Sequence, residues 1–139
     1  MTRIVVDASI TAAILLDDEV TERDSPIWDA LRDGDLFIPA YWSIEIVSLL
    51  LNAERRKRMT RQRRNEHFDS AKALLAPAEL DAAGMSRNVL DLATTASLTA
   101  YDAGYLELAM RLGASLATND HALIKAGPRH GVPILTTRP

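Results

Sequence analysis

The stretch Arg3-Ile-Val-Val-Asp-Ala-Ser9 places three β-branched residues directly before an acidic one. A short apolar run of this kind is typical of a strand that is buried on both faces. Ser9 or Thr11 can then begin a helix, because residues 10–14 carry apolar side chains at helical spacing. The stretch therefore predicts a buried strand that ends at Asp7 and passes directly into a helix.

The alternation of strand and helix continues along the chain. Further strands are predicted at residues 36–39, 79–82, 114–117 and 132–135. Helices are predicted to begin at Ser25-Pro26, Ser43, Thr60, Ser86, Tyr101 or Asp102, and Asp120. This pattern favours the α/β class, with a central parallel sheet covered on both sides by helices. Because the sequence has no repeat or linker, we expect residues 1–139 to form a single domain with three α/β/α layers.

Four acidic residues lie near the predicted carboxyl ends of strands. Asp7 ends the first strand, and Asp120 follows the fourth strand. Glu45 and Asp102 fall in the first turns of helices that adjoin the second and fourth strands. Ligands of open α/β sheets bind outside the carboxyl ends of the strands. We therefore expect the four carboxylates to face the same edge of the sheet.

Each of these acids also has a purely structural interpretation. Asp102 and Asp120 could cap helices, and Glu45 could be an acid favoured by the helix dipole. Asp7 could be a loop residue that accepts hydrogen bonds from nearby amides. Four acids at one predicted edge favour a functional site over four unrelated roles.

The composition favours oxygen ligands at this site. The chain has no cysteine, and its 3 histidines share no metal-ligand spacing. Carboxylate sites select Mg²⁺ or Mn²⁺ over zinc, and Mg²⁺ takes its remaining ligands from water and phosphate oxygens. Ser9 and Thr118 could orient the carboxylates, although each is equally plausible as a helix cap. The predicted chemistry is metal-assisted hydrolysis of a phosphodiester.

Charge is distributed unevenly along the chain. The 19 acidic and 16 basic residues give a net charge of -3, but 7 of the basic residues lie within residues 55–64. These seven are Arg55, Arg56, Lys57, Arg58, Arg61, Arg63 and Arg64. Such a basic segment could contact nucleic-acid phosphates, in which case neutralising Arg61, Arg63 and Arg64 should weaken nucleic-acid binding. A solvated helix end and contact with a partner protein are the alternatives. An opposite, acidic cluster lies at residues 17–24.

The remaining composition indicates where the protein works. The apolar run before Asp7 is too short for a signal peptide, and Ser48 interrupts the longest apolar stretch, residues 46–51. The absence of cysteine fits a reducing compartment. We therefore expect a cytoplasmic protein without a membrane segment. Four aromatic residues fall on apolar helical faces and are predicted to be core residues, namely Trp28, Trp42, Tyr101 and Tyr105.

Four segments carry a resemblance to a known family. They are Ile4-Val-Val-Asp-Ala-Ser9, Ile38-Pro-Ala-Tyr-Trp-Ser-Ile-Glu45, Tyr101-Asp-Ala-Gly-Tyr-Leu-Glu-Leu-Ala109 and Leu116-Ala-Thr-Asn-Asp-His-Ala-Leu123. The four segments occur in the order that the family has. With them the chain resembles a PIN domain and, within that superfamily, the VapC-type ribonuclease toxins of toxin–antitoxin systems. The third segment is the most specific of the four, and together they span nearly the whole chain.

The resemblance implies a PIN-like α/β/α fold and an Mg²⁺- or Mn²⁺-dependent endoribonuclease. The residues that match the family's acidic quartet and its supporting hydroxyls are Asp7, Glu45, Asp102 and Asp120, with Ser9 and Thr118. Water would attack in line and leave a 5′-phosphate and a 3′-hydroxyl. Whether Glu45 binds the metal or positions the nucleophile stays open. The resemblance also implies a homodimer and a cognate antitoxin partner.

Two other interpretations compete with this one. A catalytically inactive PIN-like module could bind RNA or a protein, but all four acids are present. A receiver or phosphatase would need a second acid beside Asp7 and a late lysine at a strand end. Here Asp7 stands alone in its segment, and Lys125 falls within a predicted helix.

Overall fold

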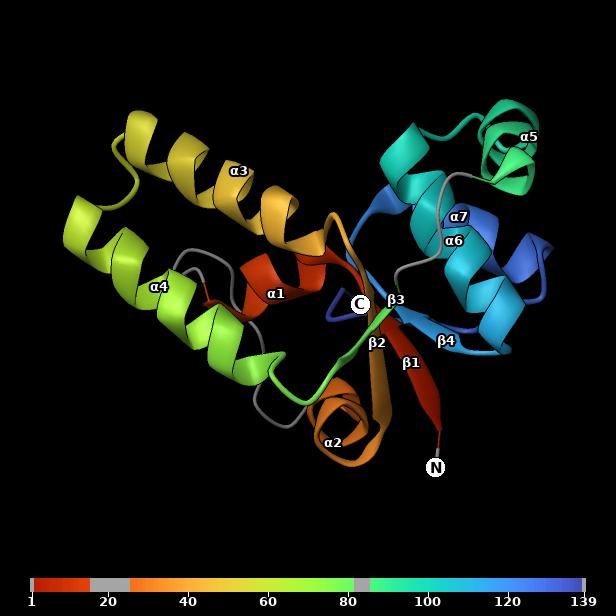
Figure 1. The fold of residues 1–139 in the computed structure, drawn as a ribbon, viewed down its shortest axis with the longest axis horizontal. Coiled ribbons are helices and arrows are strands. Elements are labelled where there is room, and N and C mark those ends of the chain that lie inside the picture. Colours follow the sequence, from red (N-terminus) through yellow and green to blue (C-terminus); the bar gives the residue numbers. More distant parts are fainter. Residues whose placement is uncertain (1, 16–25, 82–85, 139) are drawn as a thin grey trace.

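A computed structural model describes residues 2–15, 26–81 and 86–138 (Figure 1). Its strands are β1 (Arg3–Val6), β2 (Asp35–Pro39), β3 (Glu79–Asp81), β4 (Ser115–Ala117) and β5 (Ile134–Leu135). Its helices are α1 (Ala8–Leu15), α2 (Pro26–Asp33), α3 (Trp42–Arg55), α4 (Arg61–Leu74), α5 (Arg87–Thr95), α6 (Ala100–Leu112) and α7 (His121–Arg129). No helix within these ranges is both long and apolar enough to cross a membrane.

The strands form one parallel sheet in the order β3-β2-β1-β4-β5. The central strand β1 pairs with β2 on one side and with β4 on the other, so that Val5 lies opposite both Phe37 and Leu116. The order of the strands reverses at β1, because β2 and β3 extend to one side and β4 and β5 to the other. Such a reversal opens a crevice at the carboxyl ends of the strands.

Helices cover both faces of the sheet, which confirms the predicted α/β/α layers. In Figure 1, α1, α3 and α4 lie on one side, and α5, α6 and α7 lie on the other. Helix α6 packs against β1, β2 and β4, while α3 and α4 form a hairpin that contacts α1. The start of α3 also contacts α6, because Tyr41, which precedes α3, packs against Tyr105.

The core explains why β1 is so uniformly apolar. Ile4, Val5 and Val6 are at most 1% exposed, because helices pack on both faces of this central strand. Leu106 and Leu108 of α6 are buried in the same core. Side chains that are buried on both faces read as a continuous apolar run rather than as an alternating pattern.

Three helices begin earlier than the sequence predicts. Helix α1 begins at Ala8, directly after β1. Helix α3 has Tyr41 at its N-cap with no capping side chain, so the prediction of a cap at Ser43 is wrong. Helix α6 begins at Ala100 because the Thr99 hydroxyl accepts a hydrogen bond from the Asp102 amide at 3.1 Å. A capping side chain satisfies one of the free amides in a helix's first turn.

Other predicted helix boundaries are confirmed. Thr60, Ser86 and Asp120 each cap a helix by accepting a hydrogen bond from a backbone amide. The predicted cap at Ser25 and the acidic cluster at residues 17–24 lie outside the described residues. Strand β5 is shorter than predicted, because only two of its residues pair with β4.

Candidate active site

The side chain of Asp7 is the centre of the predicted site, and it is held from three directions. Asp7 is only 3% exposed, and its amide donates to the Ala117 carbonyl of β4 at 3.1 Å. Its Oδ1 accepts hydrogen bonds from the Ser9 hydroxyl at 2.7 Å and from the Ile10 amide at 3.1 Å. Its Oδ2 accepts from the Thr118 hydroxyl. The carboxylate therefore has little freedom to rotate.

Two hydroxyls connect the ends of β1 and β4. Besides contacting Asp7, the Thr118 Oγ1 accepts from the Asp120 amide at 3.0 Å. The Ser9 Oγ accepts from the Asn119 amide at 2.9 Å. The hydrogen bonds thus extend from the loop after β4 to the carboxylate that ends β1. Both predicted supporting residues lie in contact with Asp7.

Asp120 and Asp102 approach this edge from α7 and α6. Asp120 Oδ2 accepts from the Leu123 amide at 3.0 Å, so this residue does cap α7. Asp102 lies in the first turn of α6, where Thr99 rather than Asp102 is the cap. Burial raises the pKa of Asp102, and the nearby charge of Asp120 raises it further. Like charges raise one another's pKa at short range, so the two carboxylates lie in the same electrostatic environment.

Glu45 reaches the site from the opposite side of the sheet. It lies in the first turn of α3, and its Oε1 is buried without a hydrogen-bond partner. Burial raises the pKa of Glu45 to about 7, and Asp7 and Asp102 raise it as well, against a lowering by the Tyr105 hydroxyl. The Tyr105 hydroxyl and the Glu45 Oε1 do not form a hydrogen bond in this structure, because both atoms are buried without a partner. All four predicted acids therefore belong to one chain of interacting charges.

Burial also dominates the electrostatics of Asp7. It raises the pKa of Asp7 to about 6, and the charge of Asp102 adds to this, although hydrogen bonds from Thr118, Ser9 and Ile10 oppose it. Desolvation and neighbouring carboxylates, rather than counter-ions, set these values. A cluster of this kind is electrostatically unsatisfied and would gain from a bound cation.

The donor chemistry fits a hard divalent cation. The donors are carboxylate oxygens, and one of them, the Oε1 of Glu45, is buried and unpaired. Among the described residues, no three histidine, aspartate or glutamate side chains already stand close enough together to hold an ion. Mg²⁺ is usually bound through one or two carboxylates, with water or phosphate oxygens as its other ligands.

Tyr105 is a site residue that sequence reasoning missed. The prediction that it belongs to the core is confirmed, since it is 1% exposed, whereas the same prediction for Tyr101 is wrong, since Tyr101 is 57% exposed. However, its hydroxyl has no hydrogen-bond partner and lies near Glu45. Helical periodicity identifies the buried face of α6, but it carries no signal for the direction of one hydroxyl.

Asn119 has a structural role beside the site. Its Oδ1 accepts from the Thr136 hydroxyl at 2.8 Å and from the Thr137 amide at 3.1 Å. Its Nδ2 donates to the Thr137 hydroxyl at 2.6 Å. Asn119 therefore anchors the segment after β5 to the loop that carries Thr118 and Asp120.

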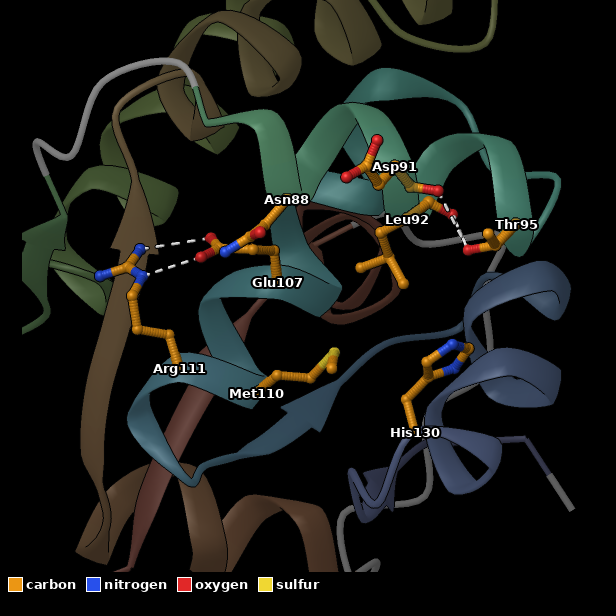
Figure 2. A pocket seen from close by; sticks show the side chains of 8 residues that line it. All are labelled: Asn88, Asp91, Leu92, Thr95, Glu107, Met110, Arg111 and His130. Carbon is orange, nitrogen blue, oxygen red and sulfur yellow. Dashed lines mark hydrogen bonds and ion pairs between the residues drawn. The ribbon is translucent and has the colours of Figure 1, made fainter.

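Two cavities lie on the α5–α6 side of the molecule. One, of about 700 Å³, adjoins Tyr41 and is mainly apolar. The other, of about 560 Å³, is drawn in Figure 2 and is lined by Asn88, Asp91, Leu92, Thr95, Glu107, Met110, Arg111 and His130. Figure 2 shows Arg111 held by Glu107 at the edge of this cavity. None of the four acids lines either cavity.

The basic segment lies away from the sheet, at the turn between α3 and α4 (Figure 1). Arg61 Nε contacts Glu54 at 3.2 Å, and Arg64 Nη1 contacts the same carboxylate at 2.8 Å. Arg55 and Arg56 are exposed at the end of α3, followed by Lys57 in a left-handed conformation with φ 58°. The structure therefore brings the four acids to one edge but not the seven cations.

Comparisons with known proteins agree with this architecture. The crystal structure of PAE2754 from Pyrobaculum aerophilum is similar, with a TM-score of 0.71 and 23% identity over 98% of this chain and 91% of that one. The crystal structure of FitAcB from Neisseria gonorrhoeae gives a TM-score of 0.61 and 16% identity over 96% of this chain and 97% of that one. No curated protein matched the sequence. The family model described as PIN domain matches residues 4–127, which is well over half of the sequence, and the chain therefore belongs to the PIN domain family.

Proposed function

We propose that this chain is an Mg²⁺- or Mn²⁺-dependent endoribonuclease. PIN domains are generally nucleases that use divalent metals. The observation that carries the proposal is the chain of interacting carboxylates, Asp7, Glu45, Asp102 and Asp120, at the carboxyl edge of a parallel sheet. Burial without counter-ions makes this cluster suited to a divalent cation and unsuited to an anion on its own.

Asp7, Asp102 and Asp120 would hold the metal, directly or through water. When bound, such an ion would supply Lewis-acid stabilisation of phosphate charge and would lower the pKa of water. Ser9 and Thr118 keep the Asp7 carboxylate in one orientation through their hydrogen bonds. Orientation of this kind matters because small displacements of a reacting group reduce rates severely.

Glu45 is proposed to accept the proton of the attacking water. Its pKa of about 7 lies near the value that suits a general base at neutral pH. Water would attack the phosphorus in line, and the bond from phosphorus to the 3′ oxygen would break. The departing oxygen takes a proton from solvent, which leaves a 3′-hydroxyl and a 5′-phosphate. Glu45 as a further metal ligand is the alternative arrangement.

The biological role proposed here is that of a VapC-type toxin in the cytoplasm. This rests on the resemblance of the four sequence segments, which also implies a homodimer and an antitoxin that blocks the site. The assignment is tested by asking whether a short neighbouring reading frame encodes a protein that copurifies with this chain and stops cleavage. A neighbour that neither binds nor inhibits the protein argues against the toxin role.

The nuclease proposal is tested by cleavage of a mixed pool of tRNA, rRNA and mRNA. Purified protein should cleave RNA with Mg²⁺ or Mn²⁺, and a chelator should stop the reaction. Asp7→Asn should be inactive, whereas Asp33→Asn, at an exposed position of α2, should cleave like the wild type. Equal cleavage by wild type and Asp7→Asn would indicate a contaminant. A wild type that binds RNA but never cleaves it would favour the alternative, an inactive PIN-like binding module.

A further inference from the structure

Six of the seven cations of residues 55–64, all except Arg58, fall into two structural groups. Arg61 and Arg64 both contact Glu54, and Arg64 and Glu54 are only 23% and 21% exposed. These contacts close the hairpin between α3 and α4. Arg63 pairs with Glu66 at 3.5 Å within α4. Part of the basic segment is therefore used to hold the hairpin together.

The second group consists of Arg55, Arg56 and Lys57, which end α3. All three are exposed, and within the described part of the chain none of them forms an ion pair. A helix C-terminus favours one or two cations through its dipole. Three adjacent cations without carboxylate partners repel one another, and the dipole alone does not require them. Their arrangement suits a polyanionic partner.

The geometry of α3 links this group to the candidate site. Arg56 follows Glu45 by 11 residues, which at about 100° per residue returns it to the same face of the helix, about 16 Å along the axis. Ser48, Leu49 and Asn52 occupy the intervening turns of that face, and all three are exposed. Two exposed polar side chains therefore lie between the candidate site and the cations.

We propose that this face of α3 is the track along which single-stranded RNA leaves the site. Arg55, Arg56 and Lys57 bind its phosphates, and Ser48 and Asn52 bind the strand between them and the site. The proposal rests on the proposed nuclease function and specifies its substrate. A stacked strand advances about 3.4 Å per nucleotide, so the cations lie roughly five nucleotides from the cleaved bond.

The test is RNA binding in a chelator, where cleavage does not interfere. The probe is a labelled oligouridylate about 12 nucleotides long, which exceeds the proposed span. The variant combines Arg55→Gln, Arg56→Gln and Lys57→Gln. Its affinity should fall, and the slope of log K against log salt should flatten by about 2, since each phosphate contact on a single strand contributes about 0.7. The control removes the same charge elsewhere, with Arg32→Gln, Lys125→Gln and Arg129→Gln.

Three outcomes overturn the track. One is an unchanged salt slope, and another is an equal loss in the control variant. The third is intact RNA binding with lost binding to poly-glutamate, which would assign the cations to an acidic protein partner. Failure of the nuclease proposal gives a different result. The wild type would then bind RNA, the triple variant would still flatten the slope of log K against log salt, and no RNA would be cleaved. The expectation that neutralising Arg61, Arg63 and Arg64 weakens RNA binding is replaced, because these arginines pair with Glu54 and Glu66. The combined Arg61→Gln and Arg64→Gln variant should have lower thermal stability and an unchanged salt slope.

A second, independent observation concerns Tyr105 and Glu45. The Tyr105 hydroxyl and the Glu45 Oε1 are buried polar atoms, and neither has a hydrogen-bond partner. Buried polar groups are nearly always paired, so an unpaired donor near an unpaired acceptor needs an explanation. The ring of Tyr105 is fixed by an edge contact with Tyr41, at a centroid distance of 5.3 Å. The Tyr105 hydroxyl also lowers the pKa of Glu45, so the two groups are neighbours.

We infer that Tyr105 is a positioning residue that donates a hydrogen bond to Glu45 when substrate is bound. Its hydroxyl would fix the carboxylate in the orientation that receives the proton of the attacking water. This inference rests on the proposed function of Glu45. It explains why residue 105, on the buried face of α6, is tyrosine rather than phenylalanine, which would fill nearly the same volume.

The test compares Tyr105→Phe with Tyr101→Phe, an exposed tyrosine one turn earlier on α6. Tyr105→Phe should lower kcat about tenfold with unchanged KM, and its thermal stability should equal or exceed that of the wild type. Tyr101→Phe should change none of these. Unchanged kcat in Tyr105→Phe overturns the inference, and so does a fall in stability that accounts for the lost activity. If wild type has no nuclease activity, the proposed function fails first.

Discussion

The substitution Asp7→Asn is expected to stabilise the metal-free protein at neutral pH while abolishing its activity. Burial raises the pKa of Asp7 from 3.8 to about 6. The folded state therefore binds a proton more tightly than the unfolded chain does. This contribution to stability is fully present below about pH 4 and is lost as the pH rises through about 6. Asparagine is neutral throughout and avoids that loss.

The magnitude follows from the shift in pKa. About two pKa units correspond to about 3 kcal/mol, at about 1.4 kcal/mol per unit. Asparagine can keep the hydrogen bonds from Ser9 and Ile10 to Oδ1, but the Thr118 hydroxyl must reverse and accept from the new amide. Allowing about 1 kcal/mol for this less favourable contact leaves a gain of about 2 kcal/mol. In a domain of this size that raises Tm by roughly 7 °C.

The assay is urea unfolding of wild type and Asp7→Asn in a chelator, at about pH 4 and about pH 7.5. The variant should be more stable only at the higher pH. Adding Mg²⁺ should stabilise wild type and not the variant, because a ligand stabilises the state that binds it. Asp33→Asn, at an exposed position, should change neither result. A variant that is no more stable than wild type at pH 7.5 would refute the assignment of a desolvated charge to Asp7.

Three further substitutions test the surroundings of the carboxylates. Thr118→Val removes hydrogen bonds to Asp7 and to the amide of Asp120, and urea unfolding should show a loss of about 2 kcal/mol. Glu45→Gln should abolish cleavage and keep RNA affinity. The activity of the wild type should rise with pH, with a midpoint at or below about 7, and the variant should show no such rise. Gly104→Ala places a methyl group against the Tyr41 hydroxyl and disrupts its bond to the Tyr101 carbonyl. Thermal unfolding should show a loss of about 1–3 kcal/mol.

The approach of the acids to one edge could be predicted because it follows from topology alone. In a parallel sheet every strand ends at the same edge, so Asp7 and the loop after β4 meet whatever the length of the connections between them. The contact between Asp7 and Thr118 joins residues 111 positions apart. No local pattern connects them, and they meet because β1 and β4 are neighbours in the sheet, an order that the strand assignments do not specify.

Other features depend on tertiary contacts that the sequence does not encode locally. Ser43 has the side chain of a helix cap, but α3 begins before it, because Tyr41 is fixed by packing against Tyr101 and Tyr105. The basic segment reads as one uniform patch, although Arg64 reaches Glu54 across the hairpin. These contacts depend on how helices pack, which helical periodicity does not specify.

The separation of the cations from the carboxylates has a physical reason. An arginine within reach of a carboxylate pairs with it, as Arg64 does with Glu54 at 2.8 Å. Such a pair at Asp7 or Asp102 would neutralise the charge that a divalent cation requires. A protein that binds both a metal and a polyanion must therefore keep its phosphate-binding cations beyond the reach of its metal ligands. Under the proposed function, the length of α3 would provide that distance, and a bound cation would relieve the repulsion among the carboxylates.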